Sequence, residues 1–99
     1  MRQGTWGAGV NEVDFVGTIE RLHRCRTRFV ERVQIAEEAA GRIWQGAVHV
    51  FDLDGHATAS RCYAWVPHVA DPTHVVMLHG ERVLSPRSAV RTWLIGGSA

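Results

Sequence analysis

The sequence contains no lysine, only two cysteines and no apolar run of about 18 residues, the length that a membrane-spanning helix requires. Its first residues lack the basic-then-apolar order of a signal peptide, so we expect a cytoplasmic protein. Cys25 and Cys62 have neither the spacing of a metal motif nor the number of a disulfide framework, which predicts two reduced packing residues. All eleven basic residues are arginine, and in a chain rich in Ala, Gly and Val this is typical of GC-rich coding DNA.

Charge and size exclude further classes of protein. A net charge of +1 gives no overall field that would draw the chain to nucleic acid or to a membrane surface. The 99 residues, 45% of them hydrophobic, suffice for one modest core but not for two domains. Three glycines fall within the first ten residues, where Trp6 is expected to fold back onto the domain. We therefore expect a flexible segment over residues 1–10 and a single domain over residues 11–99.

The first expected element is an amphipathic helix that begins at Asn11, a favourable N-cap. Apolar residues gather on one side of it with helical spacing: Phe15, Val16, Ile19, Leu22, Phe29, Val30 and Val33. The end of this helix is open, because residues 29–36 also alternate as a strand does. We favour a first strand over residues 29–36, with residues 37–41 turning the chain into a strand near Arg42, and keep a continued helix as the alternative.

A β-hairpin is predicted from Trp44 to Trp65, because two β-prone runs flank an Asp54-Gly55 pair that accepts positive φ angles. A two-residue turn at this pair sets the register, with Trp44 opposite Trp65 and Gly46 opposite Tyr63. One face is then aromatic and β-branched. The other is suited to close packing of a helix because it carries small residues: Ala47, Cys62 and Ala64. The aromatic face needs a second cover, which could be another element, a partner chain or a ligand.

The last third of the chain predicts a loop, a strand and a helix. Residues 67–72 form the loop, since Pro67 and Pro72 interrupt any ladder, and residues 74–79 form the strand. Ser85 is a suitable N-cap with proline directly after it, and Gly96 and Gly97 end the helix. The fold class is therefore α+β: an N-terminal helix, a three- or four-stranded antiparallel sheet and a C-terminal helix.

Part of the chain resembles a known group of proteins. The pattern Trp-x-Gly-x-Val-x-Val-Phe-x-Leu-x-Gly-His over residues 44–56, then Arg-Cys-Tyr-Ala-Trp over residues 61–65, is similar to short uncharacterised bacterial proteins. Some proteins of this kind are carried as mobile integron gene cassettes. The likeness covers about residues 43–93 and implies a compact α+β cytosolic protein of unassigned role, with no catalytic residues to transfer.

Catalysis and metal binding find little support in the pattern. No pair among the six histidines has the i, i+4 spacing of a helical zinc site, so we expect no metal and no cofactor. Asp52, Asp54 and His56 cluster at the expected hairpin tip, where turn chemistry explains them. A Cys62 nucleophile with His49 as its base is geometrically conceivable, because the two are diagonal neighbours on the hairpin. We expect no catalytic residue.

The sequence favours a non-catalytic binding or protein-interaction module that forms a homo-oligomer through its sheet. Aromatic rings beside an arginine are typical of interfaces and ligand clefts, so the expected ligand- or partner-binding residues are Trp44, His49, Arg61, Tyr63 and Trp65. One alternative is a small enzyme with a pocket lined by His49, Arg61 and Tyr63. Another is a nucleic-acid-binding protein whose first helix presents an arginine stripe formed by Arg21, Arg24 and Arg28, and continued by Arg32.

Overall fold

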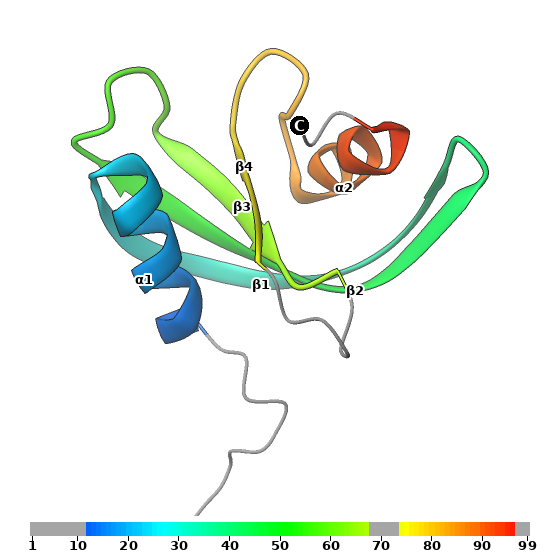
Figure 1. Ribbon diagram of the computed structural model, residues 1–99, viewed down its shortest axis with the longest axis horizontal. Helices are drawn as coiled ribbons and strands as arrows, with labels where there is room; N and C mark the ends of the chain where they lie inside the picture. Colours follow the sequence, from blue (N-terminus) through cyan, green and yellow to red (C-terminus); the bar gives the residue numbers. More distant parts are fainter. Residues whose placement is uncertain (1–11, 68–73, 97–99) are drawn as a thin grey trace, which may run out of the picture.

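The computed structural model of the protein describes residues 12–67 and 74–96. Its elements, in chain order, are α1 (Glu12–His23), β1 (Arg26–Ala39), β2 (Arg42–Asp54), β3 (Arg61–Trp65), β4 (Val75–Leu78) and α2 (Pro86–Ile95). The four strands form one antiparallel sheet in the order β1-β2-β3-β4. Figure 1 shows α2 in the concavity of the curved β1–β2 hairpin and α1 toward the other end of the sheet. The predicted α+β class is confirmed.

The two helices pack on opposite faces of the sheet. Successive strand residues point to opposite sides, and Val50 belongs to the apolar cluster under α2 while Phe51 belongs to the cluster under α1. Cys62 and Ala64 lie in the α1 cluster beside Phe15 of α1, as expected for the small-residue face. Neither described helix has the length and apolar character needed to cross a membrane.

The first helix is shorter than its apolar periodicity suggests, and the strand interpretation of residues 29–36 is confirmed. Helix α1 ends at His23, and Arg24 adopts a positive φ of 53° that breaks the helix. The side chain of Glu20 then accepts a hydrogen bond from the Thr27 backbone N–H at 3.0 Å, which fixes the start of β1. The expected Asn11 cap lies outside the described residues.

The hairpin between β1 and β2 has a tighter turn than expected. Ala39 pairs with Arg42, so Ala40 and Gly41 form a two-residue turn. Both have positive φ values, 55° and 74°, as a type I′ turn requires.

The predicted register between β2 and β3 is wrong. A two-residue turn at Asp54 and Gly55 would place Tyr63 opposite Gly46, but Tyr63 pairs with Val50, four residues further along β2. A longer loop causes the shift: the His56 ring nitrogen Nδ1 accepts hydrogen bonds from the backbone N–H groups of Thr58 and Ala59 at 3.1 and 3.0 Å. Because the shift is an even number of residues, the residues of β2 and β3 keep their predicted faces, whereas Ala59 of the loop lies in the cluster under α1.

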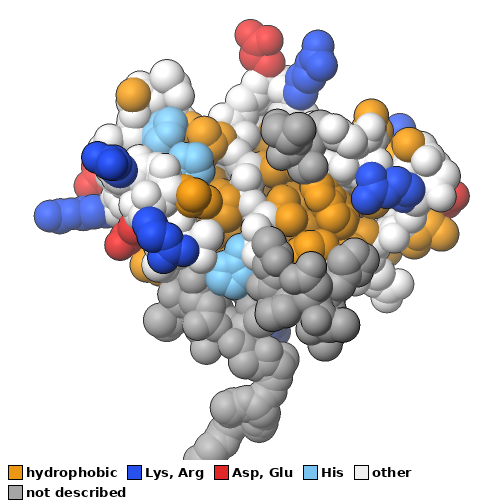
Figure 2. Space-filling view, in the orientation of Figure 1, with side chains coloured by type: hydrophobic (Ala, Val, Ile, Leu, Met, Phe, Trp, Pro, Cys, Tyr) orange, Lys and Arg blue, Asp and Glu red, His pale blue; other side chains and the backbone are white. Residues whose placement is uncertain are grey.

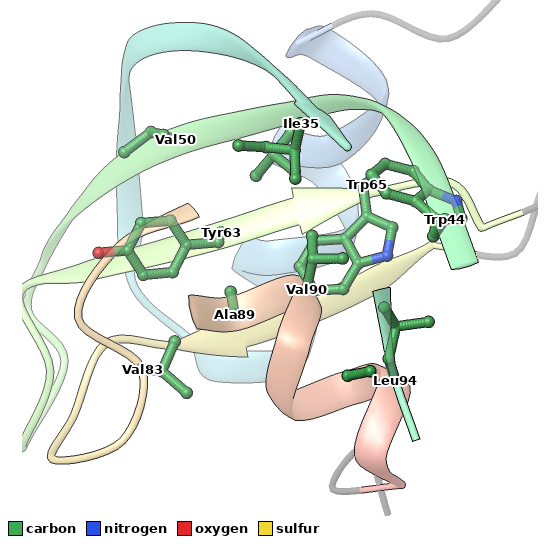
Figure 3. Packing of buried hydrophobic residues seen from close by; sticks show 11 residues of the cluster. Ile35, Trp44, Val50, Tyr63, Trp65, Val83, Ala89, Val90 and Leu94 are labelled. Atoms are coloured by element: carbon green, nitrogen blue, oxygen red, sulfur yellow. The ribbon is translucent and has the colours of Figure 1, made fainter. Parts of the chain in front are cut away.

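The aromatic face is covered by α2 of the same chain. The indoles of Trp44, Trp65 and Trp93 all contact one another, with ring centroids 6.1, 5.8 and 6.3 Å apart. Figure 3 shows Val90 of α2 against Trp65, and Leu94 belongs to the same cluster. Helix α2 is well delimited as predicted, because Ser85 and Ser88 form a reciprocal capping box and Gly96 ends the helix with a φ of 105°.

Gly46 is the position where a single added methyl group should disturb this packing. A Cβ at Gly46 would lie 2.7 Å from the Cζ2 atom of Trp44, whose ring is held by its Nε1–H bond to the Pro67 carbonyl. We expect Gly46→Ala to lower the free energy of unfolding by about 1–3 kcal/mol, measured by urea denaturation. Gly17→Ala is the control, since Gly17 is an exposed position of α1 where a Cβ meets nothing within 4 Å, and the change should stabilise the protein by about 0.5–1 kcal/mol. Equal effects of both variants would contradict the tight contact.

Candidate functional site

Three of the five expected binding residues lie in the hydrophobic core. Trp44, Tyr63 and Trp65 are 8%, 1% and 0% exposed, because α2 covers their face of the sheet. Their aromatic surface is therefore used within the chain and is not open to a partner or ligand. The hydroxyl group of Tyr63 forms a 2.8 Å hydrogen bond with Nδ1 of His79.

His49 lies on the opposite face of the sheet from Arg61 and Tyr63. It is 5% exposed and packs against Phe15 of α1, with ring centroids 4.7 Å apart. The pocket expected for the enzyme alternative, lined jointly by His49, Arg61 and Tyr63, is therefore not formed.

The Cys62 thiol is poorly suited to act as a nucleophile. Cys62 is fully buried, and burial raises the pKa of its thiol to about 12. The reactive species is the thiolate, which is scarce at neutral pH when the pKa is so high. Cys25 is also buried and free, and burial likewise raises its pKa. The expectation that both cysteines are reduced packing residues agrees with these positions.

A row of charged side chains crosses the sheet at the end away from the β1–β2 turn. Arg28 of β1 pairs in register with Asp52 of β2, and Asp52 pairs with Arg61 of β3. His79 follows β4, and its backbone N–H donates to the carbonyl of Arg61 at 2.9 Å. These four residues therefore form a continuous cross-strand row, on the same face of the sheet as α2.

Asp52 holds the two arginines of this row side by side. Its Oδ2 accepts from Nη2 of Arg28 at 2.7 Å, and its Oδ1 accepts from Nε of Arg61 at 2.8 Å. The hydrogen bond to Asp52 raises the pKa of the Arg61 guanidinium further. Arg61 donates to Asp52 through Nε, and its two terminal nitrogens carry further N–H donors.

The charged row borders an open groove of about 830 Å³. Its lining combines basic, acidic and hydroxyl side chains: Arg26, Thr27, Arg28, Asp52, Leu53, Asp54, Ser60, Arg61 and His79. Three arginines against two aspartates give these five lining residues a net charge of +1. Arg61 is the one expected binding residue that lies in the groove.

The residues at the expected hairpin tip have structural roles. The carboxylate of Asp52 pairs with the two arginines, and the ring of His56 holds the β2–β3 loop through its two backbone hydrogen bonds. Within residues 12–67 and 74–96, no three His, Cys, Asp or Glu side chains gather closely enough to hold a metal ion.

The predicted arginine stripe on the first helix is wrong. Arg21 lies on α1, Arg24 lies in the connection that follows, and Arg28 and Arg32 belong to β1. Arg21, Arg24 and Arg28 are exposed, but Arg28 is paired with Asp52. Figure 2 shows several basic side chains near one another at the left of this view, next to acidic ones, and others at the top and the right, so they do not form one continuous basic surface there.

Comparisons of the chain with protein-family models, with curated proteins and with solved structures find no match.

Proposed function

We propose that the protein is a non-catalytic binding module whose groove takes a small anion bearing carboxylate or phosphate groups. The observation that carries the proposal is the pairing of Arg28 and Arg61 on the two oxygens of Asp52. This arrangement orients two guanidinium groups beside one groove before any ligand arrives. Planar guanidinium groups bind carboxylate and phosphate oxygens through paired N–H donors.

The composition of the lining supports an anionic ligand over an apolar one. The large aromatic rings of this face are buried under α2, so they offer no stacking surface. His79 adds a ring nitrogen to the groove, and its Nδ1 is engaged by the hydroxyl of Tyr63. The bacterial cytoplasm, the setting implied by the resemblance of residues 43–93, is rich in small molecules that carry such anionic groups.

The test is a titration with inorganic phosphate and with citrate, followed by NMR shifts of backbone amides and arginine Nε–H groups. We expect Arg61→Gln to weaken binding about ten- to hundredfold, because a hydrogen bond to a charged group contributes about 1.5–3 kcal/mol. Asp52→Asn should also weaken binding, since an amide has only one oxygen and cannot hold both guanidinium groups side by side. Binding should also weaken as salt rises, because the groove is open to solvent.

Arg21→Gln is the matched control, since it removes the same charge from an exposed position of α1 outside the groove. It should leave the titration nearly unchanged. Equal weakening by Arg61→Gln and Arg21→Gln would show that only overall charge matters and would overturn the proposal. Far-UV circular dichroism checks that each variant keeps the fold.

A second candidate function is acid–base catalysis in the same groove. The hydrogen bond between Tyr63 and His79 favours it, because it fixes a histidine ring beside Arg61. General acid–base catalysis requires a titratable group held in such a position. Hydrolysis of an activated phosphate or carboxylate ester that is lost in His79→Asn and kept in Arg21→Gln would favour this function over simple binding.

A further inference from the structure

The outer edge of β1 offers an interaction surface that the groove does not use. β1 is the longest strand, with 14 residues, and the sheet order gives it one neighbour, β2. In the part of the chain that the structure describes, no strand pairs with its other side. An unpaired edge presents a row of backbone N–H and C=O groups to which another strand can bond. The two faces of the sheet are covered by α1 and α2, so self-association through the sheet has to use an edge.

Two side chains delimit the open part of this edge. Glu20 accepts from the Thr27 backbone N–H at 3.0 Å, and Arg87 donates to the Ala36 carbonyl at 2.9 Å. The β-bulge between Phe29 and Glu31 interrupts the regular ladder between these points. The stretch that remains open is residues 31–35, centred on Val33.

The alternation of the ladder identifies which residues face outward. In an antiparallel strand the N–H and C=O of one residue point to the same side, and alternate residues share a side. Since the Ala36 carbonyl is bound by Arg87 rather than by β2, Gln34 and Arg32 present their backbone groups outward as well. The side chains of Arg32 and Gln34 are exposed.

The charges along β1 select an antiparallel copy of the same strand as the partner. The amino-terminal half is basic, with Arg26, Arg28 and Arg32 against Glu31, and the carboxyl-terminal half is acidic, with Glu37 and Glu38. An antiparallel pair places the basic half of one copy against the acidic half of the other, whereas a parallel pair would place like charges together. We propose that β1 pairs antiparallel with β1 of a second copy around Val33, giving a homodimer with one continuous sheet.

This register makes a specific contact between the two copies. With Val33 on the two-fold axis, Arg32 lies opposite Gln34 of the second copy, and the reverse pair follows by symmetry. Both residues face outward, so each pair can exchange two backbone hydrogen bonds, and directly opposed side chains lie on the same face. The paired stretch is short, which places the dimer among small, reversible interfaces.

The test changes Gln34 in two opposite directions. Gln34→Glu places a carboxylate opposite Arg32 twice per dimer and should tighten the dimer about two- to thirtyfold, while Gln34→Arg should weaken it by a similar factor. Sedimentation equilibrium from about 5 μM to about 1 mM covers the range in which a small interface dissociates. The difference between the two variants should shrink at high salt.

Gln45 supplies the matched control, since it is an exposed glutamine on β2, away from the open edge. Gln45→Glu and Gln45→Arg make the same charge changes and should leave the dimer unchanged. The backbone amides of Arg32 and Gln34 should also gain protection from hydrogen exchange as protein concentration rises. A strict monomer across the whole range, or equal responses to the Gln34 and Gln45 variants, would overturn the proposal.

Discussion

Trp65→Ala should lower the free energy of unfolding by about 3–5 kcal/mol, the range for truncating a fully buried tryptophan. Trp65 is 0% exposed and lies between β3 and α2, in contact with Trp44 and Trp93. Loss of its ring leaves a cavity in the apolar cluster under α2, and the neighbouring rings have little freedom to fill the space. Because small domains have a stability of about 5–15 kcal/mol, this one change should remove a large part of it.

Urea unfolding followed by far-UV circular dichroism measures this effect without relying on tryptophan fluorescence, which the variant itself alters. Ile43→Ala is the control, because Ile43 is a large apolar residue of β2 that is 73% exposed. Its effect should stay within about 0.5 kcal/mol. A cost below about 1 kcal/mol for Trp65→Ala would mean that α2 does not pack on the aromatic face in solution, and the face would again be open to a partner.

The expected order of elements follows from local signals that the structure retains. The strand alternation in residues 29–36, the serine and proline at the start of α2 and the glycine at its end all act within a few residues. The division of β2 into two faces also follows from alternation alone. This prediction is correct although the predicted register is wrong, because a shift by an even number of residues leaves each strand residue on the same face.

The predictions that were wrong depend on contacts of individual side chains that the hydrophobic pattern does not show. Helical spacing continues past His23, but the positive φ at Arg24 and the Glu20 contact with Thr27 turn the chain into a strand. The Asp54-Gly55 pair is a strong signal for a two-residue turn, yet the His56 ring stabilises a longer loop by accepting two backbone hydrogen bonds. Neither contact follows from propensity, because each one depends on where a single side chain points.

The candidate site was harder to predict than the fold. Asp52 joins Arg28, which is 24 residues away in sequence, to Arg61, which is nine residues away. With the predicted register Asp52 would lie at a tight hairpin tip, so turn chemistry was the simplest explanation for it. One signal was available in the sequence. Asp52 and Arg61 stay on the same face of the hairpin when the register shifts by an even number of residues, so an ion pair between them could have been predicted.

Burial of the Cys62 thiol gives the stability of the protein a specific dependence on alkaline pH. The pKa of this thiol is about 12 in the folded protein, against 9.0 for an ordinary cysteine, and burial is its main cause. Between these two values the unfolded chain releases the proton and the folded chain keeps it. The unfolded state then binds fewer protons, so the free energy of unfolding falls as pH rises above about 9. Each pH unit in this window costs about 1.4 kcal/mol.

We therefore expect Cys62 to account for a loss of about 2 kcal/mol between pH 8 and pH 10.5, measured by urea unfolding at both pH values. Burial also raises the pKa of the Tyr63 phenol, which acts in the same direction, so the Cys62 contribution has to be isolated by difference.

Cys62→Ala should be less stable at pH 8, because it loses a buried sulfur, but its stability should fall less steeply with pH. Cys25→Ala is the matched control. It should reduce the loss of stability with rising pH less than Cys62→Ala does, since Cys25 lies closer to the surface of the same cluster. If wild type and Cys62→Ala lose stability in parallel, the thiol is not held in its protonated form by the core.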